Sequence, residues 1–339
     1  MGGLPLSWSE LTPEEKARVQ DNYAEKSVWG DLVRYENGVF MPRVFAEELA
    51  DRIYNMKLRK ENNNSIVYCE TWSGILDLVV SHYNICTARK DDIWILSYPK
   101  CGTTWAIETV WMVMNDVRIE TANSPQMARV PYLESYAMID HTEDSKAKTV
   151  EMKELLDDPL AFADNIQGRR FFKSHLPFDF LPPKLLETCK VIYVSRNPKD
   201  AANSFYHWMP GFNGTYESFM DMFLGGEHVY GNFFSHLLGG WKNIQNPNLK
   251  FIWFEDMKKD QMSIIRDLCT FLDHPLTEEQ IVRLADHLKF DDMKKNPHCN
   301  PTAGVEWHGG DFMRKGEVGD WRNYFSQEML TLTELDWSF

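Results

Sequence analysis

The sequence lacks the features that would place it in a membrane or a secretory pathway. No run approaches the roughly 18 apolar residues that a membrane-spanning helix needs. The first residues, MGGLPLSWSE, have neither the basic nor the apolar region of a signal peptide. The 6 cysteines form no CxxC pair and match no zinc-ligand spacing, so we expect reduced and mostly buried thiols. These absences predict a cytoplasmic protein that does not bind membranes.

An excess of positive charge is missing as well. The chain has 36 lysines and arginines against 50 aspartates and glutamates, which gives a formal net charge of −14. This balance does not favour binding to nucleic acid or to an acidic membrane. An anionic ligand would therefore need a local cluster of basic residues and helix N-termini. The remaining composition, 43% hydrophobic and 25% charged over 339 residues, is that of an ordinary globular protein.

Short apolar runs alternate with helical patterns along most of the chain. Buried strands are predicted in DDIWILSYP, CKVIYVSRN and LKFIWFED, and helices in AIETVWMVMN, DAANSFYHWM and MSIIRDLCTFL. This alternation predicts a single α/β domain over residues 1–339, in which helices flank a central parallel sheet.

Other elements are predicted from local signals. Thr12 precedes a short exposed helix in the mixed segment 1–60, and Thr277 with Gln280 forms a capping box. A buried helix is predicted over 65–85. We expect 140–165 to be an exposed insertion with a helix near Met152–Leu156, because it is rich in Asp, Glu and Lys.

The segment SYPKCGTTW joins the first strand to the following helix. Helix N-termini present unpaired N–H groups and partial positive charge, which suit a phosphate. Gly102 would allow close approach of a ligand, Lys100 adds a charge, and Thr103 and Thr104 add hydroxyl groups. An ordinary strand–turn–helix with a threonine cap is the alternative. The segment is not a P-loop, because the pattern G-x-x-x-x-G-K-[ST] is absent.

Three further segments carry basic residues. RFFKSHLP places Lys173 and His175 two residues apart, so both would face the same way in a strand. VSRNPKDAANS places Arg196 at a strand end and Ser204 about two helical turns further on, and RKGEVGDW forms a basic loop near the C-terminus. Taken singly, these could be a surface pair, a strand-end arginine with a buried serine, and a solvated turn.

In this order, YPKCGTTW, KSHLP, VSRNPKD…S and RKGEVGDW resemble the cytosolic sulfotransferases. That family transfers a sulfuryl group from 3′-phosphoadenosine 5′-phosphosulfate (PAPS) and releases the desulfated nucleotide PAP. The resemblance runs from Trp94 to Phe325. It implies a P-loop-like phosphate-binding strand–loop–helix, no metal, and an N-terminal segment 1–60 on the acceptor side.

The resemblance also implies a donor site. Trp105 and Phe290 would sandwich the adenine, while Arg196, Ser204 and Arg314 would contact the 3′-phosphate. The implied donor-binding residues together are Lys100, Cys101, Gly102, Thr103, Thr104, Trp105, Arg196, Ser204, Phe254, Phe290, Met313, Arg314, Lys315 and Gly316.

For the reaction itself, the resemblance assigns His175 as the general base and Lys173 as its partner lysine. A histidine with an ordinary pKa of about 6.5 suits proton removal at neutral pH. Lys100 and Lys173 can supply positive charge to the departing phosphate.

Four positions depart from the family pattern. Cys101 stands at a usual serine, which a backbone contact would tolerate. Phe254 replaces a tyrosine and Leu288 a threonine, so donor affinity is expected to differ from the family norm. The C-terminal dimer motif KxxxTVxxxE appears as RNYFSQEMLT, in which Thr331 replaces the terminal acid. We therefore expect a monomer, or a dimer with a non-standard interface.

The acceptor is less defined. The resemblance implies an apolar pocket beside His175, with Phe178, Tyr206 and Trp208 as lining candidates, although all three are equally compatible with a plain core role. The implied acceptor is a small lipophilic alcohol or phenol. The long stretch before Lys173 resembles an arthropod-type branch, in which a related enzyme dehydrates retinol through a sulfated intermediate. Three functions stay open: a sulfotransferase, a retinol-dehydratase-like lyase, and a PAPS- or PAP-binding protein without turnover.

Overall fold

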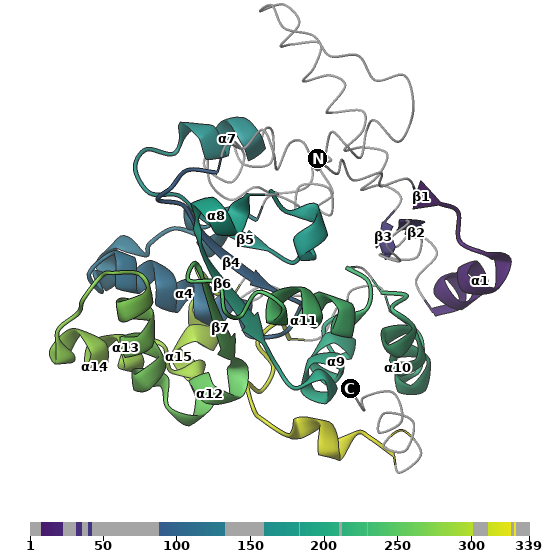
Figure 1. Ribbon diagram of the computed structural model, residues 1–339. Coiled ribbons are helices and arrows are strands. Elements are labelled where there is room, and N and C mark those ends of the chain that lie inside the picture. Colours follow the sequence, from purple (N-terminus) through teal and green to yellow (C-terminus); the bar gives the residue numbers. More distant parts are fainter. Residues whose placement is uncertain are drawn as a thin grey trace, which may run out of the picture.

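The computed structural model describes residues 8–22, 32–35, 40–42, 88–132, 159–182, 184–209, 212–228, 230–300, 311–326 and 329. A four-stranded sheet in the order β5-β4-β6-β7 forms its centre (Figure 1). All three strand pairings are parallel, which confirms the predicted fold class. The strands are β4 (Ile93–Ser97), β5 (Phe171–Ser174), β6 (Lys190–Ser195) and β7 (Leu249–Trp253).

Each face of the sheet is covered by helices. One face packs against α4 (Thr103–Met114), α12 (Phe254–Lys259), α13 (Gln261–Phe271), α14 (Glu278–His287) and α15 (Phe290–Lys295). The other packs against α8 (Leu185–Thr188), α9 (Pro198–Tyr206), α10 (Tyr216–Gly225) and α11 (Phe233–Trp241).

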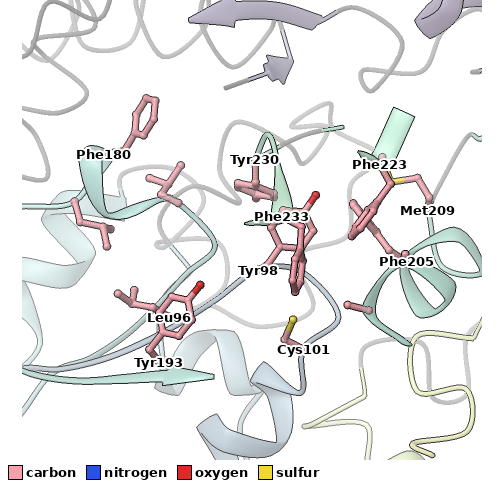
Figure 2. Packing of buried hydrophobic residues seen from close by; sticks show 14 of the residues in the cluster. Leu96, Tyr98, Cys101, Phe180, Tyr193, Phe205, Met209, Phe223, Tyr230 and Phe233 are labelled. Atoms are coloured by element: carbon pink, nitrogen blue, oxygen red, sulfur yellow. The ribbon is translucent and has the colours of Figure 1, made fainter. Parts of the chain in front are cut away.

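Alternate residues of the strands point to the two faces, as a pleated sheet requires. Ile93 and Ile95 lie in the core under α4, whereas Trp94 and Leu96 lie in the core under α9 to α11. This second core is rich in aromatic rings. Figure 2 shows part of it, where the edge of the Tyr98 ring meets neighbouring aromatic rings, among them Phe205, Phe223 and Phe233.

Smaller elements lie outside the central sheet. An antiparallel sheet holds β1 (Trp8–Ser9), β2 (Leu32–Tyr35) and β3 (Phe40–Pro42), and α1 (Pro13–Asn22) follows β1. Thr12 and Glu15 exchange side-chain-to-backbone hydrogen bonds at the start of α1. The capping box of Thr277 and Gln280 is also present at α14. The remaining short helices are α5 (Gln126–Arg129), α7 (Pro159–Asn165), η2 (Ile119–Thr121), η4 (Phe178–Phe180) and η5 (Asp320–Asn323).

Some sequence predictions differ from the structure. The third predicted strand was too long: it ends at Trp253, and Phe254 begins α12, where two acidic residues suit the first turn of a helix. The end of the segment 140–165 forms α7, in which Ala163 is fully buried rather than exposed. The predicted helices over 65–85 and Met152–Leu156 lie outside the described residues. In the described part of the chain, no helix has the length and apolar character needed to cross a membrane.

Candidate active site

The loop between β4 and α4 has the backbone of an anion site. Gly102 precedes α4 with φ 97°, a left-handed conformation that glycine adopts without strain. A Cβ atom there would lie 2.6 Å from the ring of Phe254, so no other residue fits without movement. The intrahelical bonds of α4 start with the Ala106 N–H to the Gly102 carbonyl. The first-turn N–H groups of this 12-residue helix therefore have no acceptor within the helix and can face an anion.

His175 follows directly after β5, at the same edge of the sheet. Its Nδ1 lies 2.7 Å from the Ser97 carbonyl oxygen at the end of β4. A carbonyl can only accept, so Nδ1 carries the proton and Nε2 is the basic nitrogen of the neutral ring. Burial and the charge of Lys173 hold the pKa of His175 well below its ordinary value, which keeps the ring neutral.

Lys173 and His175 contact the same aromatic ring. The Lys173 ammonium lies 4.0 Å from the centroid of Tyr132, and the His175 ring meets Tyr132 edge-on at 5.4 Å. The Lys173 and His175 side chains therefore lie on the same side of the chain, next to Tyr132, as their two-residue spacing predicted.

Lys100 reaches from the loop to a second aromatic group. Its Nζ donates to the Phe312 carbonyl oxygen at 2.8 Å and lies 5.0 Å from the centroid of Trp208. Burial and the nearby charges of Arg196, Lys173 and Arg314 lower the pKa of Lys100 well below its ordinary value. These positive charges repel one another, and a bound anion with several negative charges would offset that repulsion.

Arg196 links the loop that contains Lys100 to the C-terminal loop, which is the segment RKGEVGDW at residues 314–321. Its guanidinium donates to the Lys100 carbonyl at 3.2 Å and to the Glu317 carbonyl at 2.7 Å, and it packs on Phe254 at 4.3 Å. Asp200 in α9 holds the same C-terminal loop, because its carboxylate accepts from the N–H groups of Gly319 at 2.6 Å and Trp321 at 3.1 Å.

Asp320 orients the two cations of the C-terminal loop. Its carboxylate binds Arg314 and lies 2.7 Å from the Lys315 ammonium. Burial alone would raise the pKa of Asp320, but hydrogen bonds from Lys315, Arg314 and Asn323 hold it far below its ordinary value. The result is a fixed pair of basic side chains on this loop.

The other predicted donor-site residues lie around this cluster. Trp105 meets Phe254 edge-on at 5.8 Å, and Phe290 fits closely against Gly316, where a Cβ would lie 2.4 Å from its ring. Ser204 lies on α9, and Met313 packs against the core under α4.

The loop side chains divide between core and site. The Cys101 thiol is fully buried in the aromatic core, which raises its pKa, so only its backbone is available to a ligand. Leu288, at the third departure from the family pattern, is likewise a core residue. The Thr103 hydroxyl lies 2.5 Å from that of Ser97, and the Thr104 carbonyl accepts from the Gln126 amide.

The three acceptor-lining candidates have different surroundings. Trp208 lies near Lys100 and meets Phe312 at 6.0 Å, so its contacts tie it to the candidate site. Phe178 stacks on Tyr193 at 5.9 Å, and Tyr206 packs against core rings such as Phe219.

Several residues of the site carry no signal in the sequence. The rings of Tyr132 and Tyr230 both meet His175 edge-on, at 5.4 and 5.6 Å, and their hydroxyls form a short hydrogen bond. Phe312 and Ser97 were likewise not predicted. In the described part of the chain, no three His, Cys, Asp or Glu residues are grouped as metal ligands.

Comparison with known proteins agrees with this geometry. The chain matches the sulfotransferase domain family over residues 90–334. It is 37% identical to sulfotransferase 1B1 of Mus musculus over 254 residues, which are 72% of this chain and 79% of that protein. It is 32% identical to luciferin sulfotransferase of Photinus pyralis, with 71% of this chain and 69% of that protein covered.

Solved structures extend the likeness to the whole fold. Retinol dehydratase in a complex with retinol and PAP is similar with a TM-score of 0.79 and 27% identity, covering 99% of this chain and 96% of that chain. Mouse sulfotransferase SULT7A1 complexed with PAP has a TM-score of 0.60 and 26% identity, covering 90% and 93%. The chain belongs to the sulfotransferase family, and it is a sulfotransferase enzyme.

Proposed function

We propose that this enzyme transfers the sulfuryl group of PAPS to the hydroxyl of a small lipophilic acceptor, giving a sulfate ester and PAP. The observation that carries the proposal is the placement of His175. Its basic nitrogen is defined by the bond from Nδ1 to Ser97, and it lies in the same site as the cations Lys173 and Lys100. PAP in the solved structures of similar proteins supports the choice of donor.

The residues of the site fit a nucleotide with phosphates at two positions. The first turn of α4 and Lys100 would hold the 5′-phosphosulfate, because helix N–H groups and an ammonium both favour anions. Arg196, Ser204 and the loop with Arg314, Lys315 and Gly316 would hold the 3′-phosphate. Trp105 and Phe290 would stack on the adenine. PAPS brings the sulfuryl group, and the protein's own cations neutralise its phosphates without a metal.

His175 would remove the proton of the acceptor hydroxyl through Nε2. A positioned base of this kind contributes about 10²–10⁴-fold to the rate. Lys100 and Lys173 would stabilise the charge that develops on the phosphate as the sulfuryl group departs. This division of roles explains why one neutral histidine lies beside two lysines.

The acceptor is proposed to be lipophilic because aromatic rings surround His175. Tyr132 and Tyr230 meet it edge-on, and Trp208 lies beyond Lys100. Retinol and androsterone in the solved retinol dehydratase complexes are acceptor-sized lipophilic alcohols, which is consistent with this class.

A retinol-dehydratase-like lyase is the second candidate. The similarity to retinol dehydratase, with a TM-score of 0.79 over 99% of this chain, exceeds the 0.60 of the mouse sulfotransferase. Such an enzyme would eliminate sulfate from the sulfated acceptor and release an anhydro product. A PAPS- or PAP-binding protein without turnover is disfavoured by the presence of Lys100, Lys173 and His175.

A panel of acceptors with labelled PAPS, read by mass spectrometry, tests these proposals. We expect PAP release together with a product heavier than the acceptor by one sulfuryl group. A product lighter than the acceptor by one water would instead favour the lyase. Tight PAP binding without product from any phenol, sterol or retinoid would identify a binding protein and overturn the proposal.

We propose that residues 1–339 form one domain with 1–60 on the acceptor side, and that the enzyme acts in the cytosol. Cys101, Cys189, Cys269 and Cys299 are free and buried in the structure, which is consistent with a reducing compartment.

A further inference from the structure

His236, on α11, contacts the backbone of His175 from the core. Its Nε2 lies 3.0 Å from the His175 carbonyl oxygen, and both residues are buried. Because a carbonyl can only accept, Nε2 of His236 carries the proton and donates to His175. His175 is thus held twice, through its ring by Ser97 and through its carbonyl by His236.

Tyr193, on β6, fixes the state of His236. The Tyr193 hydroxyl lies 2.6 Å from Nδ1 of His236. With the proton of the neutral ring on Nε2, Nδ1 is an acceptor, and the Tyr193 hydroxyl, which also lies 2.9 Å from the His236 carbonyl oxygen, donates to these two acceptors of His236. Burial lowers the pKa of His236 to about 4, which keeps the ring neutral at neutral pH.

Gly240 allows this contact to form. It lies four residues after His236 and so on the same face of α11. A Cβ at Gly240 would lie 2.8 Å from the ring of Tyr193. The glycine therefore lets α11 approach β6 closely enough for the Tyr193 hydroxyl to reach the His236 ring.

We infer that the Tyr193–His236 pair is a positioning device for the transfer reaction, which sets the backbone of His175 so that its Nε2 faces the acceptor hydroxyl. The inference rests on the proposed function, because it requires His175 to be the base. Displacement of a catalytic group by about 1 Å can lower a rate by about 10²-fold, so a bond that fixes its backbone is expected to affect turnover.

Three variants separate positioning from packing. His236→Leu removes the donor, His236→Gln keeps an N–H donor at a similar reach, and Tyr193→Phe removes only a hydroxyl. His228→Leu is the matched control, because His228 is also a buried histidine, and its Nε2 donates to the Phe219 carbonyl at 3.1 Å rather than to His175.

We expect His236→Leu to lower kcat by about 5- to 100-fold for a weakly acidic phenol, with PAP affinity changed by less than about threefold. Tyr193→Phe should lower kcat by about 2- to 10-fold, the effect of one hydrogen bond. His236→Gln should recover most of the loss. The deficits should shrink for acidic phenols that are already ionised, which a merely structural defect would not produce. His228→Leu should lower the melting temperature but leave kcat within about twofold.

Equal deficits for all phenols, or His236→Gln as slow as His236→Leu, would overturn the inference. If the leucine variant does not fold, Tyr193→Phe gives the same comparison across phenols. His175→Ala in the same assay separates the two proposals. If it is slow while His236→Leu and Tyr193→Phe are not, the proposed function stands and the positioning role fails. If it is as fast as the parent enzyme, the role of His175 fails and this inference with it.

Discussion

The Nδ1 atom of His175, at the end of β5, lies 2.7 Å from the carbonyl oxygen of Ser97, at the end of the neighbouring strand β4. The Ser97 hydroxyl in turn lies 2.5 Å from that of Thr103 in the first turn of α4. The candidate base and the candidate phosphate loop are therefore held by the same residue. This arrangement fixes the proton on Nδ1 and leaves Nε2 as the base.

Arg196→Ala should weaken PAP far more than adenosine 5′-phosphosulfate, which has no 3′-phosphate. A charge-assisted hydrogen bond is worth about 1.5–3 kcal/mol, so the loss for PAP should be roughly 10- to 150-fold. Calorimetry with both ligands measures the difference. Arg266→Ala, which removes an equal charge from an exposed pair with Glu278, is the control and should change neither affinity. Equal losses for both ligands would remove Arg196 from the 3′-phosphate site.

Asp200→Asn should loosen the C-terminal loop, because an amide has one acceptor oxygen for the two N–H groups that Asp200 now binds. We expect PAP affinity to fall roughly tenfold, about 1.4 kcal/mol, with a smaller effect on turnover at saturating donor. Asp267→Asn, in an exposed pair with Lys250, is the matched control. Unchanged PAP binding in Asp200→Asn would show that this anchor does not shape the donor site.

Stability should fall as pH drops from about 6.5 towards 5. Burial lowers the pKa of His175, His228 and His236, to about 4 for the last two, whereas the unfolded chain titrates near 6.5. The unfolded state therefore binds more protons in this range, and each histidine lowers the free energy of unfolding by up to about 1.4 kcal/mol per pH unit. Urea unfolding at several pH values measures the slope. His228→Gln should reduce this slope by up to the contribution of one proton, because glutamine does not titrate. An unchanged slope would contradict the neutral state of His228.

The oligomeric state should not depend on the degenerate C-terminal motif. Ser326 is exposed, whereas Gln327 and Thr331 lie outside the described residues. We expect Ser326→Glu with Gln327→Glu to leave the mass measured by light scattering unchanged. A dimer in the parent protein that this double change dissociates would show that the motif still works despite Thr331.

Local patterns were sufficient to predict much of the fold and part of the site. The apolar runs predicted β4, β6 and the start of β7. The loop with Lys100 and Gly102 connects β4 to α4, as predicted. The end of β7 was missed, because the local apolar pattern continues into Phe254 while the chain there begins α12.

The surroundings of His175 could not be predicted in this way. Tyr132, Tyr230 and His236 come from segments that are distant in the sequence, and the fold alone brings them to His175. Phe178 illustrates the reverse problem, because an aromatic residue near a site motif can equally well pack on a neighbour such as Tyr193.

The role of His175 as the general base is tested by the rate of sulfuryl transfer by His175→Ala across phenols of graded acidity, measured together with PAP affinity. We expect the rate to fall by at least about 10²-fold for weakly acidic phenols, and this loss to shrink as the acceptor pKa falls. PAP affinity should change by less than about threefold, or roughly 0.7 kcal/mol. His228→Ala controls for the removal of a buried histidine. A loss of the same size for every phenol, with weaker PAP binding, would show that His175 has a structural role and is not the general base.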